Sequence, residues 1–327
     1  SFCVFPIALQ VFRAADLPRT LLPGAIATGA FGITMTAVPG TPQIQNLIPT
    51  DYYGTTTMAA PLLSLVACAV MLLPAYIYLE WRVRQSRRKG LHFVPDPKHK
   101  EVDHDSKALP SWHWVTGIVP LVVVVLMLNL FPWLLNRFAG IELASNYAIV
   151  IALVCGILVA CLLNLNQAKT LLPAINEGAN GSMGAIMNTA CAVGFGSVVK
   201  VVPGFASLTS IALNMPGSIL FSEAVAVNLL AGATGSASGG MSIALSALGP
   251  KYAEMAAGNT GVLEALHRIA SISSGGLDTL PHNGAVLTLL AVSNCTHKES
   301  YIDICITTCI IPLVSSLGLA LIWGLFL

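Results

Sequence analysis

Residues Ser271–Thr296, SISSGGLDTLPHNGAVLTLLAVSNCT, form an apolar segment that helix-breaking residues interrupt in its middle. Gly275 and Gly276 add backbone freedom, and Pro281 has no N–H and clashes with the preceding helical turn. Backbone groups left open in hydrocarbon are costly, so irregular backbone at membrane depth must line a protein or water-filled cavity. The segment therefore predicts a discontinuous membrane helix with a site at its break.

Three polar side chains accompany Pro281 in this break: Asp278, His282 and Asn283. Ionisable groups inside a membrane segment are functional candidates, so the sequence favours a site over a proline kink without a ligand. We expect Asp278 to take part in ion coupling, as a proton acceptor or as a sodium ligand. His282 lies one helical turn further on and could share the proton. In the alternative interpretation, Asp278 only caps the following half-helix.

The composition is that of a polytopic membrane protein, because 55% of the residues are hydrophobic, only 9% are charged and the mean hydropathy is +0.76. The predicted fold class is all-α, with the lipid bilayer as its surroundings. A net charge of +1 without a basic stripe gives no sign of a nucleic-acid partner. The eight cysteines include no C-x-x-C pair, so no disulfide, metal or cofactor is expected.

The first part of the chain contains a second interrupted segment. Thr20–Thr50 has no charged residue and is long enough to cross a bilayer, but Thr34–Asn46, TMTAVPGTPQIQN, interrupts it. This pattern predicts a second discontinuous helix. Met58–Leu79 follows as an uninterrupted span.

Glu80–Lys107 is a strongly charged stretch that holds 13 of the chain's 31 acidic and basic residues. We interpret residues 81–110 as a cytoplasmic loop by the positive-inside rule. Its histidines, His92, His99 and His104, are interpreted as solvated rather than metal-bound. A count of the crossings that follow places the C-terminus on the opposite side of the membrane.

Residues 111–177 are predicted to be connecting, or scaffold, helices, because Val115–Leu135 and Tyr147–Leu165 are charge-free spans with aromatic residues near their ends. Gly178–Asn214 is rich in small and polar residues and predicts a re-entrant hairpin with its tip near Gly194–Ser197. A pair of glycine-rich helices packed through small residues is the alternative.

Another apolar segment, Pro216–Leu248, is interrupted at Gly232–Gly240, GATGSASGG, where continuous helix is disfavoured. Glu223 precedes this interruption and is the only charged residue between Lys200 and Lys251. Ile304–Leu327 is predicted to be the last span.

The two halves repeat one pattern: when Pro39 is set on Pro281, apolar residues after one break fall on apolar residues after the other. The crossing count makes the halves run in opposite senses, which is the inverted-repeat design of secondary transporters. Residues 1–80 would be the second part of the first repeat, and residues 178–327 the second repeat. We expect the missing hairpin of the first repeat to precede Ser1.

The stretches Gly194–Gly196, Ala233–Gly240 and Ser274–Gly284 carry a family resemblance. Through them the chain resembles the gluconate permease (GntP) family of the ion transporter superfamily. The resemblance implies a homodimer in the cell inner membrane that moves hydroxylated organic acid anions, usually with protons. Gluconate carriers tend to have a Pro-Pro-His-Pro-Gly-Pro type run in the first broken helix. This chain has PGTPQIQN at Pro39–Asn46, and so looks more like the branch associated with 3-hydroxybutyrate.

The predicted function is therefore secondary active transport of small hydroxy- or ketocarboxylate anions, such as 3-hydroxybutyrate or gluconate, coupled to protons. A sodium-coupled di- or tricarboxylate transporter and an organic anion channel are the alternatives. An intramembrane enzyme is disfavoured, because the sequence has neither H-E-x-x-H nor G-x-S-x-G. Half-helix N-termini are expected to hold the carboxylate. The residues expected around the substrate are Thr36, Thr41, Gln43, Asn46, Gly194, Gly196, Ser197, Thr234, Ser236, Thr279 and Asn283.

Overall fold

The computed structural model of the chain describes residues 4–95, 113–140, 143, 145–165, 168–204, 207, 210 and 217–326. Within this part the secondary structure is helical and no strand occurs, as the composition predicts. Four of its helices are long and apolar enough to cross a membrane: Arg19–Ala37, Pro61–Arg88, Gly117–Ala139 and His297–Trp323. The prediction of a helical membrane protein with several spans is thus supported.

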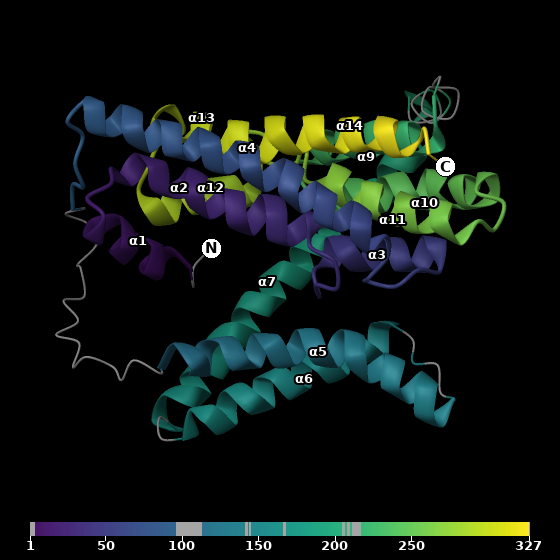
Figure 1. Cartoon of the computed structure of the whole chain (residues 1–327), viewed down its shortest axis with the longest axis horizontal. Coiled ribbons are helices and arrows are strands. Elements are labelled where there is room, and N and C mark those ends of the chain that lie inside the picture. Colours follow the sequence, from purple (N-terminus) through teal and green to yellow (C-terminus); the bar gives the residue numbers. More distant parts are fainter. Residues whose placement is uncertain are drawn as a thin grey trace.

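The described helices form a large bundle and a smaller helical layer beside it (Figure 1). The smaller layer is the pair α5 (His113–Ala139) and α6 (Ser145–Leu163), which pack through Leu128, Ala148 and Ala152. Helix α7 (Ala168–Lys200) runs from this pair to the large bundle, where it contacts α10. Helices therefore occur at both of the predicted connecting segments and lie side by side, and their role as connecting helices stays a prediction.

The discontinuous helix predicted within Thr20–Thr50 is present, and its break is shorter than the predicted interruption Thr34–Asn46. A helical rod made of η1 (Arg19–Leu21), α2 (Leu22–Ala27) and η2 (Thr28–Ala37) ends where Val38 becomes extended. Helix α3 (Ile44–Tyr53) then starts after Gln43. We call Val38–Gln43 the first break. Pro39 and Pro42 account for it, since neither can donate a helical hydrogen bond.

Helix α4 (Pro61–Arg88) is longer than the predicted span, because it continues into the charged stretch. The expectation that the loop starts after Glu80 is wrong for Glu80–Arg88, where Glu, Arg and Gln are good helix formers. The helix stops at Lys89, next to Gly90 in the left-handed conformation with φ +64°. Residues 96–107 of the predicted loop, with His99 and His104, lie outside the described residues.

The predicted hairpin tip at Gly194–Ser197 is wrong, because α7 is one helix from Ala168 to Lys200. Glycine lowers helix stability by only about 1 kcal/mol per residue, and no proline lies between Pro173 and Pro203. Without a proline the small residues of this stretch remain helical. Ala168–Lys200 is one helix, and not the pair of glycine-rich helices of the alternative interpretation.

A helical hairpin occurs instead at the third interruption, where α9 (Ile219–Thr234) turns into α10 (Ala237–Met255). Gly235 makes the turn in the left-handed conformation, with φ +59°. The two helices then pack closely: a Cβ on Gly240 would lie 2.2 Å from the main-chain nitrogen of Ala231. We call Thr234–Ser236 the hairpin tip.

The segment Ser271–Thr296 is broken as predicted. Helix α11 (Thr260–Ser274) ends before Gly275, and α12 (Gly284–Ser293) begins after Asn283. We call Gly275–Asn283 the second break. The last span is α13 (His297–Ile304), η4 (Cys305–Ile310) and α14 (Ile311–Trp323), with η4 as a π-helical insert.

The two half-helices that follow the breaks match each other. Both α3 and α12 have ten residues, and both end in a left-handed residue, Gly54 with φ 63° and Asn294 with φ 50°. These caps pair Gln43 with Asn283, a register two residues away from the one that pairs Pro39 with Pro281. The short half-helices cannot cross a membrane alone, so each leaves its break inside the bundle.

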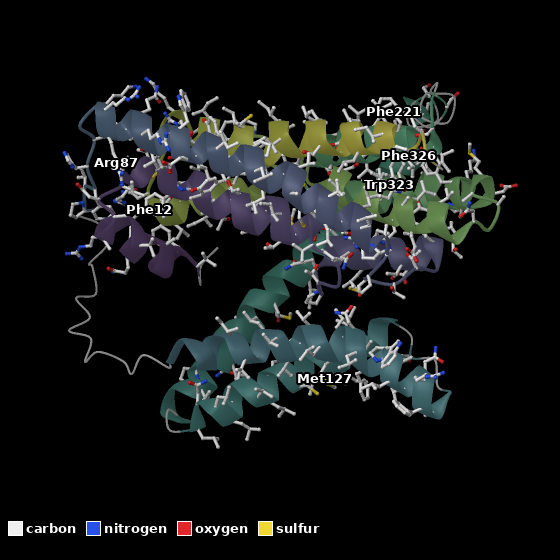
Figure 2. The ribbon with its side chains drawn as sticks, viewed as in Figure 1. Phe12, Arg87, Met127, Phe221, Trp323 and Phe326 are labelled. Atoms are coloured by element: carbon white, nitrogen blue, oxygen red, sulfur yellow. The ribbon has the colours of Figure 1, made fainter. Side chains whose placement is uncertain are left out.

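One continuous apolar core joins α3, α4, α9, α10, α11 and α14, with Leu63, Met71, Leu245 and Leu266 fully or almost fully buried. Leucine, isoleucine and valine side chains on the outer faces of α4, α5, α6 and α14 are exposed, as expected of lipid-facing helices. Arg87 and Phe326 lie at opposite ends of the long axis of the large bundle (Figure 2).

Candidate functional site

The two breaks meet inside the large bundle. Ser271 of α11 donates from its hydroxyl to the main-chain oxygen of Thr36 at 2.9 Å. A Cβ on Gly275 would lie 2.8 Å from the Thr36 methyl group. The end of the first helical rod thus rests on the start of the second break, and Thr36 itself is buried.

The hairpin tip lies against the other end of the second break. The side-chain amide of Asn283 donates to the main-chain oxygens of Gly235 at 2.9 Å and Asp278 at 2.8 Å. Its Oδ1 accepts from the backbone N–H groups of Ala285 and Val286 and so caps α12. One side chain therefore connects the hairpin, the second break and the half-helix.

Asp278 is buried within the second break, and its Oδ1 has no hydrogen-bond partner in the described part of the chain. Because Asn283 caps α12, the interpretation of Asp278 as the cap of that half-helix is wrong. His282 is exposed and packs beside Gly235, and no hydrogen bond joins it to Asp278 among the described residues. The coupling role of Asp278 and His282 stays a prediction.

Thr279 connects the second break to the π-helical insert of the last span. Its hydroxyl lies 2.7 Å from the hydroxyl of Thr308 and 3.1 Å from the Cys309 sulfur. Insertions of π-helix are often found at functional sites, because they change which side chains face a neighbour. Here η4 presents both partners of Thr279 to the second break.

Arg268 is a functional candidate that our sequence analysis missed. Its side chain is fully buried, and its guanidinium donates to the main-chain oxygens of Thr57 and Ala59, each at 3.1 Å. Within the described part of the chain no carboxylate lies within ion-pair distance of it. The spacing of these residues in the sequence could have indicated this role. Arg268, Ser271 and Gly275 are three and four residues apart, so they share one helix face that leads into the second break.

The main-chain carbonyl of Thr57 accepts hydrogen bonds both from residues at the first break and from Arg268. It accepts from the Gly40 N–H at 2.9 Å, from the Asn46 side-chain amide at 3.0 Å and from Arg268. Asn46 also contacts the buried His267, with 3.2 Å between Asn46 Oδ1 and His267 Nε2. The other ring nitrogen of His267 lies 2.6 Å from the Thr55 hydroxyl. Arg268 thus binds main-chain oxygens before and after α3, and His267 contacts side chains in and after α3.

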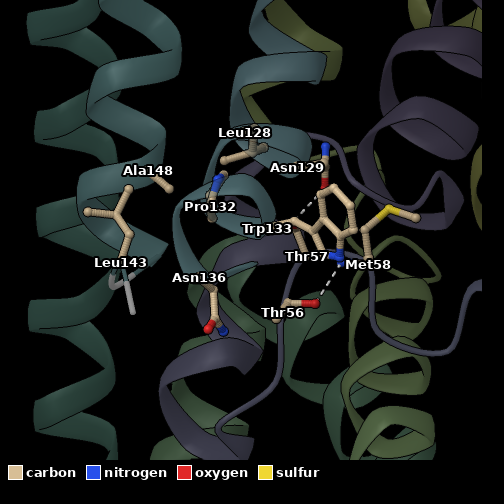
Figure 3. Close-up of a pocket in the computed structure, with 10 residues that line it drawn as sticks. All are labelled: Thr56, Thr57, Met58, Leu128, Asn129, Pro132, Trp133, Asn136, Leu143 and Ala148. Atoms are coloured by element: carbon tan, nitrogen blue, oxygen red, sulfur yellow. Dashed lines mark hydrogen bonds between the residues drawn. The ribbon is translucent and has the colours of Figure 1, made fainter. Parts of the chain in front are cut away.

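A cavity of about 440 Å³ opens between the segment after α3 and the α5–α6 pair (Figure 3). Asn129 of α5 lines it and donates to the main-chain oxygen of Gly40 at 2.9 Å, in the first break. The volume falls in the range of small-molecule sites. Its lining mixes amides and hydroxyls with apolar groups: Thr56, Thr57, Met58, Leu128, Asn129, Pro132, Trp133, Asn136, Leu143 and Ala148.

The structure brings most of the predicted site residues to these junctions, but not all. Thr41 and Asn46 lie at the first break, Thr234 and Ser236 at the hairpin tip, and Thr279 and Asn283 in the second break. Gln43 is exposed, and its side chain does not cap α3. Gly194 is exposed in α7, and Gly196 and Ser197 lie in the same helix.

Among known proteins, the chain is similar to a bacterial transporter. No protein-family model matches the chain, and no solved structure matches it. The chain is 39% identical to a Bacillus subtilis (strain 168) protein named "Uncharacterized transporter YxjC", over 329 aligned positions that cover 93% of this chain and 70% of that protein. Together with its membrane-length helices, this similarity shows that the chain belongs to the same transporter family as the Bacillus protein.

Proposed function

We propose that the protein is a secondary active transporter of small hydroxy- or ketocarboxylate anions, such as 3-hydroxybutyrate or gluconate, driven by protons. The observation that carries the proposal is the junction of two helix breaks beside the buried, unpaired Arg268. Secondary transporters bind their substrates where discontinuous helices meet near the bilayer midplane. The membership of a transporter family supports the same conclusion.

The charge at this junction favours an anion. Among the described residues the buried guanidinium of Arg268 hydrogen-bonds to carbonyl groups alone, which supply no counter-ion, and burying a positive charge without a counter-ion is costly. A substrate carboxylate at the first break would supply the counter-ion. The N-termini of α3 and α12 add positive potential, because each half-helix begins directly after its break.

The polar groups of the cavity favour a substrate that also carries hydroxyl or keto oxygens. Asn129, Asn136 and Thr56 line it beside apolar side chains. Amide and hydroxyl groups can each donate and accept, so they suit a hydroxyl group better than a second carboxylate. The cavity lies between the large bundle and α5, where movement of one part against the other would expose it to either side.

The proton is the coupling ion that Asp278 favours. Asp278 has an unpartnered buried oxygen and, among the described residues, no cation in ion-pair contact, so its neutral acid form is favoured while it is buried, and it ionises when water reaches it. The alternative is a sodium-coupled di- or tricarboxylate transporter. It is favoured by two further buried oxygens without partners in the described chain, Asn228 Oδ1 and Ser273 Oγ. A test of whether a proton gradient or a sodium gradient drives uptake distinguishes the two transporters.

The inverted repeat, the homodimer and the inner-membrane location belong to this proposal. The equal lengths and caps of α3 and α12 support the repeat, and their mutual packing partners support its symmetry: α3 packs on α11, and α12 packs on α2. The homodimer and the inner-membrane location rest on the resemblance to gluconate permeases. In the proposed second repeat, the α9–α10 hairpin takes the place of the hairpin predicted at Gly178–Asn214.

Counterflow in liposomes tests the substrate and the role of Arg268 together. Purified protein should exchange internal 3-hydroxybutyrate for labelled 3-hydroxybutyrate and discriminate against succinate and citrate. Arg268→Gln should abolish exchange, because the site loses its positive charge. Arg84→Gln is the matched control, since Arg84 is exposed and forms an ion pair with Glu80 across one helical turn. Exchange by Arg268→Gln at the wild-type rate would show that Arg268 does not take part in substrate binding.

A further inference from the structure

Glu223 is the most deeply buried carboxyl of the hairpin and has no role in the site described so far. It lies in α9, the first arm of the hairpin, and its side chain is fully buried. The hydroxyl of Tyr53, the last residue of α3, hydrogen-bonds to Oε1. Oε2 is buried without a hydrogen-bond partner, and within the described part of the chain no cation forms an ion pair with Glu223.

The ionisable groups on the neighbouring elements do not neutralise Glu223. On α10, Tyr252 hydrogen-bonds to the hydroxyl of Ser222 at 2.8 Å, while Lys251 and Glu254 are exposed. On α3, Tyr53 is the contact, and Tyr52 packs against Gly249. On α11, His267 and Arg268 are bound to groups around the first break, and Glu264 accepts from the Ala60 N–H. The contributions of α14 to this core are Ile311, Leu317, Leu319, Ala320 and Trp323.

We propose that Glu223 is a second proton-binding site, separate from Asp278, with the Tyr53 hydroxyl as its partner. A carboxylate sealed in this core without a counter-ion is costly, whereas the neutral acid is tolerated. The proton comes from water, binds the carboxylate to form the acid, and returns to water when the group is exposed. The inference rests on the proposed function, because it assumes transport driven by protons.

The position of Glu223 gives this proton a defined effect. Helix α9 leads to the hairpin tip, which contacts the second break through Asn283. Helix α3 leads back to the first break. The contact between Glu223 and Tyr53 therefore connects the hairpin arm to the half-helix of the other break. Protonation allows the two helices to stay packed, and loss of the proton favours an arrangement in which water reaches the carboxylate.

Charge movement tests the proposal. A monoanion that crosses with one proton moves no net charge, whereas one that crosses with two protons carries one positive charge inward. Wild-type uptake of labelled 3-hydroxybutyrate into liposomes should therefore rise when a potassium diffusion potential makes the interior negative, at equal pH on both sides. Glu223→Gln keeps the size and the hydrogen bond but loses the titration. It should keep counterflow exchange and uptake driven by a pH gradient, and lose the stimulation by membrane potential.

Two results would overturn the inference: wild-type uptake that ignores the membrane potential, or undiminished stimulation in Glu223→Gln. Absence of both counterflow and proton-driven uptake in the wild type would instead reject the proposed function. If Glu223→Gln does not fold, Tyr53→Phe takes its place, with Tyr52→Phe as the control. Tyr53→Phe should shift the pH of half-maximal uptake relative to both the wild type and Tyr52→Phe, and an unchanged pH profile would count against the site.

Discussion

Asn283 holds the hairpin tip against the second break, because its side-chain amide donates to the main-chain oxygen of Gly235 at 2.9 Å. The same side chain caps α12 with its oxygen. The cap and the link are therefore made by different atoms of one residue. This separation allows a substitution to remove the link while it keeps the cap.

Asn283→Asp should abolish transport while it keeps the cap of α12. Aspartate caps a helix as well as asparagine does, but it cannot donate to Gly235 or to the Asp278 carbonyl. Asn283→Ala should lose the cap as well, at a further cost of about 1 kcal/mol. Counterflow and thermal unfolding in detergent measure the two effects. Asn259→Asp is the matched control, because Asn259 caps α11 with its oxygen. Equal transport by both aspartate variants would contradict the role of the Asn283 amide.

Gly240→Ala should prevent the arms of the hairpin from packing. The added Cβ would lie 2.2 Å from the nitrogen of Ala231 and 2.5 Å from the carbonyl carbon of Leu230, so backbone atoms would have to move. Overpacking of this kind costs about 1–3 kcal/mol or more, and the melting temperature in detergent should fall. Gly318→Ala in α14 is the control, because nothing lies within 4 Å of its added Cβ. Similar melting temperatures for both variants would mean that the hairpin arms are not in contact.

Asp303→Asn should destabilise the bundle. The buried carboxylate accepts from Arg82 Nε at 2.6 Å, from Arg82 Nη2 at 3.1 Å and from the Tyr78 hydroxyl at 2.7 Å. Removing one partner of a buried ion pair typically costs about 3–5 kcal/mol. Glu80→Gln, which breaks the exposed pair with Arg84, should cost at most about 1 kcal/mol. Chemical denaturation of both variants in detergent compares the costs, and equal values would refute the burial of the Asp303 pair.

Cysteines at Lys89 and Phe326 should react with impermeant reagents from opposite sides of the membrane. The charged end of α4 and the C-terminal end of α14 lie at opposite ends of the bundle (Figure 2). By the positive-inside rule, the cysteine at Lys89 should be accessible only from the cytoplasmic side. Labelling of intact cells and of inverted vesicles measures this. Reaction of both positions from one side would rule out the opposite orientation of the two halves.

The sequence predicted where the helices break, because proline and glycine act locally. Pro39 and Pro281 lie in the two breaks, and Gly235 makes the turn of the third interruption. It failed at Gly194–Ser197, where glycine without proline remains helical in α7. It also gave no sign that α9 and α10 fold back on each other, because that depends on the close approach of Gly240 to Ala231.

The charged part of the candidate site depends on contacts that are distant in sequence. Arg268 meets Thr57 across 211 residues, and Glu223 meets Tyr53 across 170 residues. Local patterns cannot reveal such pairs, although the shared face of Arg268, Ser271 and Gly275 could have suggested the first. The register of the repeat also needed the structure, since the helix caps pair Gln43 with Asn283 and the prolines suggest another alignment.

Accumulation in liposomes distinguishes a proton-driven carrier from a channel. Purified protein is reconstituted, an acidic exterior is imposed, and the internal and external concentrations of labelled 3-hydroxybutyrate are compared over time. A proton-driven carrier should raise the internal concentration above the external one, and a protonophore should abolish the difference. Equilibration to the external concentration with no response to the pH gradient would exclude proton-driven transport and favour an anion channel.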